Sequence, residues 1–179
     1  IRTEAALELV VDGHCVDREA GELQLVDYGI SGIPVFQLSR YAAYALQEGK
    51  KAAVYINFLP GFTDEAEDPR ECALRLYRQR QERLAGRKME SFFTGLLHQK
   101  LGQLLLRMGN VRPELPVAEL SEKQLRSLAS LSVRFKAECV EMNGFLQAQV
   151  VAGGVDTSEV DPRTMASRLV PGLYFAGEV

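Results

Sequence analysis

The chain has 179 residues, of which 46% are hydrophobic and 25% charged, a composition typical of a globular protein with one substantial core. Its 21 basic and 24 acidic side chains give a net charge of −3, so no overall field favours nucleic acid or an anionic membrane as a partner. No apolar run reaches the roughly 18 to 20 residues of a membrane span, and no secretory signal pattern opens the sequence. We therefore expect a cytoplasmic protein without a membrane or nucleic-acid partner.

Cysteine and histidine are too few and too scattered to indicate a metal centre. Cys15, Cys72 and Cys139 form no CxxC pair, and His14 and His98 stand in no metal-binding pattern. We expect three reduced, partly buried thiols and no bound metal.

The first 32 residues favour antiparallel strands. Residues 5–26 alternate between apolar and polar side chains on both sides of a turn at Asp12 and Gly13. This pattern predicts that residues 1–32 form part of a β-barrel or sheet.

Residues 33–131 are predicted to be mainly helical, with one strand. A helix is expected over residues 33–47, since Pro34 lies in its first turn and Gly49 just after its end. The segment KAAVYINFL, residues 51–59, is rich in β-branched and aromatic residues and is expected to be a buried strand.

A second helix is predicted from Asp68 to Gly86. Asp68 has the role of N-cap and Pro69 follows at the first helical position. At roughly 100° per residue, its inward face is expected to carry Ala73, Tyr77 and Leu84.

Two more helices follow in this region. Residues 91–109 carry an apolar stripe at helical spacing, which predicts a helix ending at Gly109. Ser121 and Gln124 form a capping-box pattern that predicts a short helix to about Leu131.

The last part of the chain returns to strands. Residues 132–152 are expected to form a returning β-hairpin around an Asn143-Gly144 turn, with a return strand over residues 146–151. In residues 153–179, the apolar segment from Leu173 to Ala176 is expected to be a strand. The predicted class is α+β, with a barrel or sheet portion from both chain ends and an inserted helical subdomain.

The densest charge feature is a run of basic residues from Arg70 to Lys88. Such a helix is typical of a solvated surface with ion pairs, and it can also bind an acidic partner or nucleic acid. The arginines spread around the helix instead of gathering on one face, so we favour the ion-paired surface. The interaction module remains the alternative function.

Two glycine-containing stretches admit a structural and a functional interpretation. Gly29, Ser31 and Gly32 precede a helix, where they either cap it or present free N–H groups to an anion or a polar ligand. Gly153 and Gly154 are either a plain turn or a place where the backbone approaches a flat ligand.

A resemblance covers nearly the whole chain. The stretches GELQLVDYGISGIPVFQLSR (21–40) and AQVVAGGVDTSEVDPRTMASRLVPGLYFAGEV (148–179), with the strand exit at residues 57–60, resemble the bacterial flavoproteins known as HI0933-like proteins or NAD(FAD)-utilizing dehydrogenases. In that family an FAD-binding domain is split in sequence around a barrel part and a helical part. The resemblance implies an internal fragment that holds this insert, with residues 153–179 beginning the returning FAD-binding segment.

The sequence departs from the family pattern at two points. Val26 and Asp27 stand where the family more often has Thr-His, and Ile33 stands before Pro34 where the family has proline directly after Ser-Gly. The family's histidine therefore has no counterpart at this position.

The resemblance implies a set of cofactor-binding residues near the end of the chain. Gly153 and Gly154 would approach the flavin ring, while Ala176 and Gly177 would leave room for the cofactor against the backbone. Glu178 would accept a hydrogen bond from a ribityl or ribose hydroxyl, because a carboxylate about 4 Å from a phosphate would be repelled by several kcal/mol at intermediate dielectric.

The resemblance also implies a substrate side. Gly29, Ser31 and Gly32 would line it, and Tyr28 beside them is the candidate proton donor for catalysis.

The implied function is that of a fragment of an FAD-dependent oxidoreductase, with NAD(P)H as a possible reductant and an unidentified small-molecule substrate. Its partner would be the remaining FAD-binding domain of the same protein. The 179 residues contain no G-x-G-x-x-G turn for the pyrophosphate, so we expect the fragment alone to be inactive and to lack FAD.

Overall fold

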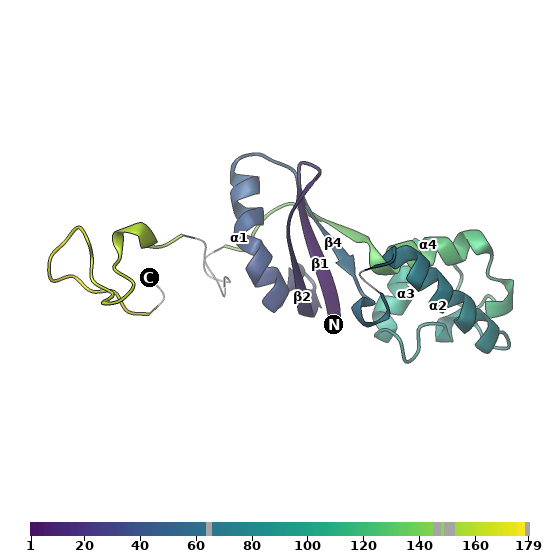
Figure 1. Cartoon of the computed structure of the whole chain (residues 1–179). Coiled ribbons are helices and arrows are strands. Elements are labelled where there is room, and N and C mark those ends of the chain that lie inside the picture. The colour runs from purple at the N-terminus through teal and green to yellow at the C-terminus, as the bar shows by residue number, and fades with distance from the viewer. Residues whose placement is uncertain (64–65, 145–147, 149–152, 178–179) are drawn as a thin grey trace. The chain divides into compact units, whose positions relative to one another are not determined.

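Five strands and four α-helices make up the regular structure of the computed structural model, which describes residues 1–63, 66–144, 148 and 153–177 (Figure 1). In chain order they are β1 (Arg2–Val11), β2 (His14–Val26), β3 (Gly29–Ser31), α1 (Ile33–Gln47), β4 (Ala52–Asn57), α2 (Pro69–Arg83), α3 (Gln99–Met108), α4 (Glu122–Val133) and β5 (Phe135–Cys139). The predicted α+β class is confirmed. The chain divides into two units, residues 1–143 and 144–179.

The strands of the first unit form one antiparallel sheet in the order β3-β2-β1-β4-β5. A tight turn joins β1 to β2, where Asp12 and Gly13 have φ values of 48° and 85°. Glycine and aspartate adopt such values at low cost, which explains why the chain reverses here as predicted.

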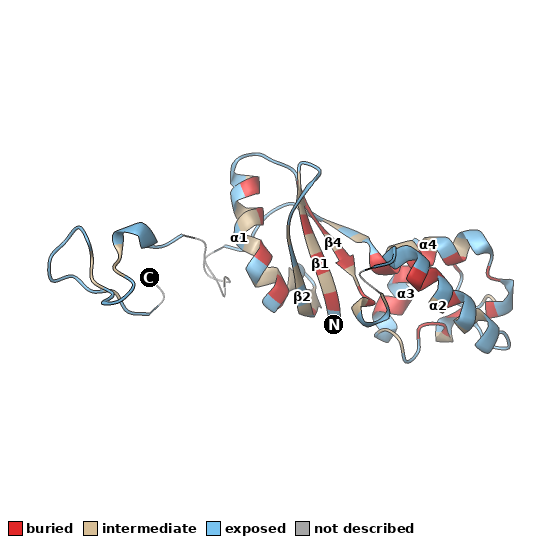
Figure 2. Cartoon of the chain, in the orientation of Figure 1, coloured by how far each residue is buried: buried red, intermediate tan, exposed pale blue. Residues whose placement is uncertain are grey.

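Helix α1 covers one face of this sheet. Its buried residues Leu38, Ala42 and Ala45 pack towards the strands, and the alternate residues Leu7 and Leu9 of β1 are also buried. Figure 1 shows α1 lying alongside β1 and β2, and Figure 2 shows buried positions alternating along the strands.

The opposite face of the sheet is polar. Glu8 accepts hydrogen bonds from Arg18 and Arg134, each at 3.3 Å. The Arg134 guanidinium also lies 4.2 Å from the centre of the Tyr55 ring, a cation–π contact.

Helices α2, α3 and α4 form a helical part with its own apolar interior (Figure 2). The inward face predicted for α2 is confirmed, since Ala73 and Tyr77 are fully buried and Leu84 is partly buried. Both predicted caps are present: Asp68 accepts from the Arg70 N–H at 2.9 Å, and Ser121 and Gln124 form a capping box.

The helix predicted over residues 91–109 is wrong in its first half. Helix α3 begins only at Gln99, where His98 is the N-cap and accepts from the Lys100 N–H. The preceding residues form turns, because Gly95 has a φ of 76° and cannot continue a right-handed helix.

Two further expectations need correction. Cys15 is exposed, not partly buried, whereas Cys72 is buried and Cys139 half-buried. The predicted strand over residues 173–176 is reduced to a single bridge between Ala166 and Tyr174. The return strand predicted over residues 146–151 lies outside the described residues except for Ala148.

The second unit is held by turns. Asp156 accepts from the Ser158 N–H and hydroxyl, and Asp161 accepts from the Arg163 N–H. These hydrogen bonds lower the pKa of both carboxyl groups. None of the described residues of this unit is buried, so its apolar side chains, such as Leu169 and Tyr174, remain accessible.

Candidate functional site

The junction between β3 and α1 holds the predicted substrate-side residues. Strand β3 pairs with β2, so that Gly29 lies opposite Val26 and Ser31 opposite Gln24. Gly32 is the N-cap of α1, and no side chain caps the helix there. Gly29, Ser31 and Gly32 therefore lie close together where β3 ends and α1 begins.

Gly32 is required by close packing. Its φ is 110°, and a Cβ built on it would lie 2.3 Å from the Glu22 carbonyl oxygen of β2. The residue lets α1 start directly against the sheet, which supplies a structural reason for this glycine. Ser31 makes no side-chain capping bond, so the interpretation of Ser31 as a cap is not supported.

Tyr28 lies beside this junction with 72% of its surface exposed. The neighbouring Ile33 is also largely exposed, at 70%. Together they give the start of α1 an aromatic and an apolar side chain that face solvent. A phenol in this position can donate a proton to a bound molecule.

The predicted cofactor residues lie in the second unit. Gly153 and Gly154 have φ values of 119° and 117°, and Gly177 has a φ of 87°. Cβ atoms built on Gly153 and Gly177 would meet no atom within 4 Å. Ala176 is exposed, while Glu178 lies outside the described residues.

These glycines meet the requirement of a surface on which a planar group lies against the backbone. Two successive residues with positive φ are a conformation that residues with side chains rarely adopt. A Cβ on Gly153 or Gly177 would meet open space, so no packing contact fills the position beside either residue. The residues present at Gly153, Gly154 and Gly177 therefore fit a flat cofactor.

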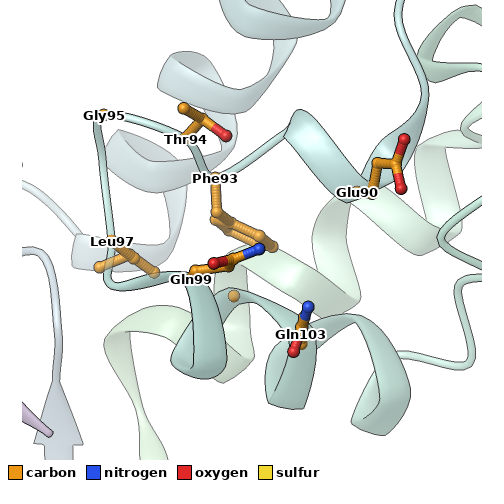
Figure 3. A pocket seen from close by; sticks show the side chains of 8 residues that line it. Glu90, Phe93, Thr94, Gly95, Leu97, Gln99 and Gln103 are labelled. Carbon is orange, nitrogen blue, oxygen red and sulfur yellow. The ribbon is translucent and has the colours of Figure 1, made fainter.

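A cavity of about 410 Å³ lies in the helical part, between α3 and the preceding turns (Figure 3). Its lining consists of Glu90, Phe93, Thr94, Gly95, Leu97, Gln99, Gly102 and Gln103. In Figure 3, Gln99 and Gln103 project from α3 beside the segment that carries Phe93. Sequence analysis did not identify this site, because its lining comes from two segments that the predicted helix merged into one.

Two contacts fix the walls of this cavity. The Arg80 side chain donates to the carbonyls of Phe92 and Thr94, both at 2.9 Å. A Cβ on Gly102 would lie 2.8 Å from the Phe93 Cβ, so glycine allows α3 to approach this segment closely. The cavity is thus bounded by backbone that packing and hydrogen bonds hold in place.

The arginines of α2 are largely engaged within the helical part. Arg75 pairs with Glu67 at 2.7 Å, and Arg78 pairs with Glu122 of α4. These partners lower the pKa of both carboxyl groups. With Arg80 bound to carbonyls, three arginines of this helix have partners inside the protein, as expected for an ion-paired surface.

No helix in the described part of the chain has the length and apolar character needed to cross a membrane.

The family model for the HI0933-like protein barrel and H2TH domain matches residues 3–150. The chain belongs to this HI0933-like family. The match covers the sheet and the helical part of the first unit, and the resemblance drawn from the sequence is confirmed.

Three curated relatives give the family a functional context. The chain is 36% identical over all 179 residues to the 3-dehydro-bile acid delta(4,6)-reductase of Clostridium scindens, covering 42% of that protein. It is 30% identical over 151 residues, 84% of the chain, to the ribosomal RNA dihydrouridine synthase of Escherichia coli, covering 34% of it. It is 28% identical over 174 residues, 97% of the chain, to that of Haemophilus influenzae, covering 39%.

The chain thus spans less than half the length of the curated relatives that it matches. It corresponds to a domain of an oxidoreductase-related protein, and the reductase relative matches it from end to end.

Proposed function

We propose that the chain is the substrate-side domain, with part of the cofactor site, of an FAD-dependent oxidoreductase that reduces a carbon–carbon double bond conjugated with a carbonyl group. The observation that carries this proposal is the 36% identity to a delta(4,6)-reductase along the whole chain. The FAD itself is inferred from the HI0933-like family.

The names of both kinds of relative indicate the same reaction, which is reduction of a carbon–carbon double bond conjugated with a carbonyl group. A delta(4,6)-reductase acting on a 3-dehydro steroid reduces double bonds conjugated with a carbonyl. Dihydrouridine is uridine whose ring double bond, also conjugated with a carbonyl, has gained two hydrogens. The substrate class proposed for this protein is therefore an α,β-unsaturated carbonyl compound.

Bound FAD, once reduced by NADH or NADPH, would supply the hydride for the double bond. Gly153 and Gly154 would hold their bare backbone against the flat ring. Ala176 and Gly177 would leave room for the cofactor, and Glu178 would accept a hydrogen bond from a sugar hydroxyl.

On the substrate side, the chain would orient the carbonyl compound and deliver a proton. Gly29, Ser31 and Gly32 would present polar backbone and a hydroxyl at the start of α1. The exposed Tyr28 hydroxyl would donate the proton to the carbon next to the carbonyl, which completes the addition of hydrogen across the double bond.

We also propose that the 179-residue chain needs the remaining FAD-binding domain as its partner. The chain has no G-x-G-x-x-G turn for the pyrophosphate, so by itself it would bind little FAD and show no activity. Stoichiometric FAD binding by the isolated chain would contradict this part of the proposal.

The test is a spectrum and an assay of the complete protein that contains this chain. The proposal expects yellow flavin absorbance bands, and consumption of NADH or NADPH when a 3-oxo-4,6-diene steroid or a uridine-containing RNA is added. Mass spectrometry of the organic product should show a gain of two hydrogens per reduced bond. A colourless protein, or a flavoprotein that reduces neither compound, would overturn the proposal.

A further inference from the structure

Helix α3 presents an exposed face that carries basic, amide and apolar side chains. Its members are Gln99, Lys100, Gln103, Leu104, Arg107 and Met108. At roughly 100° per residue they occupy about half of the helix circumference, and the buried Leu101, Leu105 and Leu106 occupy the rest. The sequence has no aspartate or glutamate between Glu90 and Glu114, so this face is locally positive although the chain is not.

The cations of this region have no acidic partner in the described part of the chain, whereas Arg75 and Arg78 of α2 are ion-paired. Within the described ranges, Lys100, Arg107 and the nearby Arg112 form no ion pair. In ideal helix geometry Lys100 and Arg107 lie about 20° apart around the axis and about 10 Å apart along it. They therefore offer two uncompensated positive charges on the same side of one rigid helix.

The cavity borders this basic face, because Gln99 and Gln103 belong to both (Figure 3). Glutamine amides donate and accept hydrogen bonds and can pair with the edge of a nucleobase. Glu90 adds an acceptor for a base N–H, and its charge disfavours a phosphate inside the cavity. A volume of about 410 Å³ has room for one base.

We propose that α3 binds a single-stranded polynucleotide, with phosphates on Lys100 and Arg107 and one unstacked base in the cavity beside Gln99 and Gln103. A single strand is required because a base inside a duplex cannot enter a cavity. This inference deepens the proposed function, whose test already includes a uridine-containing RNA, by assigning a binding surface for a polynucleotide. It also departs from the expectation of no nucleic-acid partner, which rested on the charge of the whole chain.

The test is fluorescence anisotropy of the full 179-residue chain with end-labelled oligouridine or oligothymidine of about 12 nucleotides. We expect Lys100→Glu/Arg107→Glu to weaken binding at least about 10-fold. The matched control is Arg70→Glu/Arg83→Glu, which makes the same charge change at exposed positions of α2 and should alter affinity less than about 2-fold. Circular dichroism establishes that both variants fold.

Two further arms separate the phosphate and base contacts. Between roughly 50 and 200 mM KCl, Lys100→Ala/Arg107→Ala should reduce the slope of log affinity against log salt by about 1.4. Gln99→Leu/Gln103→Leu should weaken binding at every salt concentration and leave that slope unchanged. Tighter binding of oligouridine assigns the partner as RNA, and tighter binding of oligothymidine assigns it as DNA.

Either preference supports the proposal. Equal losses in the α3 and α2 charge variants, absence of binding at the lowest salt concentration, or binding of duplexes alone would overturn it. Flavin chemistry plays no part in this measurement, so its failure is distinguishable from failure of the proposed reductase function.

Discussion

The Tyr77 hydroxyl donates a 2.6 Å hydrogen bond to Ser132 Oγ inside the helical part, and both residues are fully buried. Ser132 in turn donates to the Leu128 carbonyl at 2.8 Å. This chain of donors joins α2 to α4 across 55 positions of sequence. These two hydrogen bonds give the Ser132 hydroxyl both a donor and an acceptor partner. Ser132 is the one residue in the polar or charged class that is buried among the described residues.

Removal of either hydroxyl should destabilise the protein, and Ser132→Ala should have the larger effect. That change leaves the buried Tyr77 hydroxyl without its acceptor and should lower the free energy of unfolding by about 2 kcal/mol. Tyr77→Phe leaves Ser132 its bond to Leu128 and should cost about 1 kcal/mol. Urea unfolding measures both values.

The double variant is the control for direct coupling between the two residues. Because both single changes break the same hydrogen bond, their combination should cost less than the sum of the single effects. Strictly additive losses would show that the two hydroxyls act independently.

The same tyrosine should make stability fall at alkaline pH. Burial raises the pKa of Tyr77 above its ordinary value of 10.0. As the pH rises, the Tyr77 phenol therefore ionises in the unfolded chain before it ionises in the folded protein. Its contribution to the free energy of unfolding is complete below pH 10 and is lost as the pH rises above that value. The loss approaches about 1.4 kcal/mol per pH unit for one group.

Comparison of variants isolates this contribution. The stability difference between wild type and Tyr77→Phe, measured by urea unfolding, should shrink above pH 10 because the variant has no phenol to ionise. Tyr28→Phe removes an exposed hydroxyl and leaves Tyr77 in place, so the alkaline loss caused by Tyr77 should persist in this variant. A constant difference between wild type and Tyr77→Phe across this range would contradict the prediction.

Features that depend on contacts between neighbouring residues could be predicted from the sequence. The cap at Asp68, the capping box at Ser121 and the Asp12-Gly13 turn each rest on contacts between residues within a few positions of one another, so their patterns are visible in the sequence. The alternation of β1 likewise reflects a sheet with one face buried by α1.

Features that depend on contacts between residues far apart in the sequence could not be predicted in this way. The apolar stripe over residues 91–109 fits a helix, yet Gly95 has a positive φ there and Arg80 of α2 binds the Phe92 and Thr94 carbonyls, so this segment forms turns. The cavity that these turns create was therefore not predictable from periodicity. Similarly, the need for glycine at position 32 comes from Glu22, a residue of another strand.

Gly32→Ala should strongly destabilise the first unit. The new Cβ would lie 2.3 Å from the Glu22 carbonyl oxygen, at a φ of 110° that alanine rarely adopts. We expect a loss of about 3 kcal/mol in the free energy of unfolding. Thermal and urea unfolding, followed by circular dichroism, measure it.

Gly86→Ala is the matched control, because its Cβ would meet no atom within 4 Å and its φ lies outside the positive range. Its effect should stay within about 0.5 kcal/mol. If Gly32→Ala is equally mild, β2 and α1 do not approach each other as closely as the structure indicates.

The last prediction concerns catalysis by the complete flavoprotein. If Tyr28 donates the proton, Tyr28→Phe should lower kcat for double-bond reduction by about 100-fold. The flavin absorbance spectrum and the unfolding free energy should remain unchanged, because the hydroxyl is exposed and its loss disturbs no packing. Stopped-flow oxidation of the reduced flavin by substrate measures the step directly.

Tyr44→Phe supplies the control for this substitution. Tyr44 lies on α1 and is also half exposed, so loss of its hydroxyl is chemically the same change at a position remote from the start of that helix. The control should retain wild-type turnover. Equal rates for wild type and Tyr28→Phe would remove Tyr28 from the reaction and leave the proton to another group or to solvent.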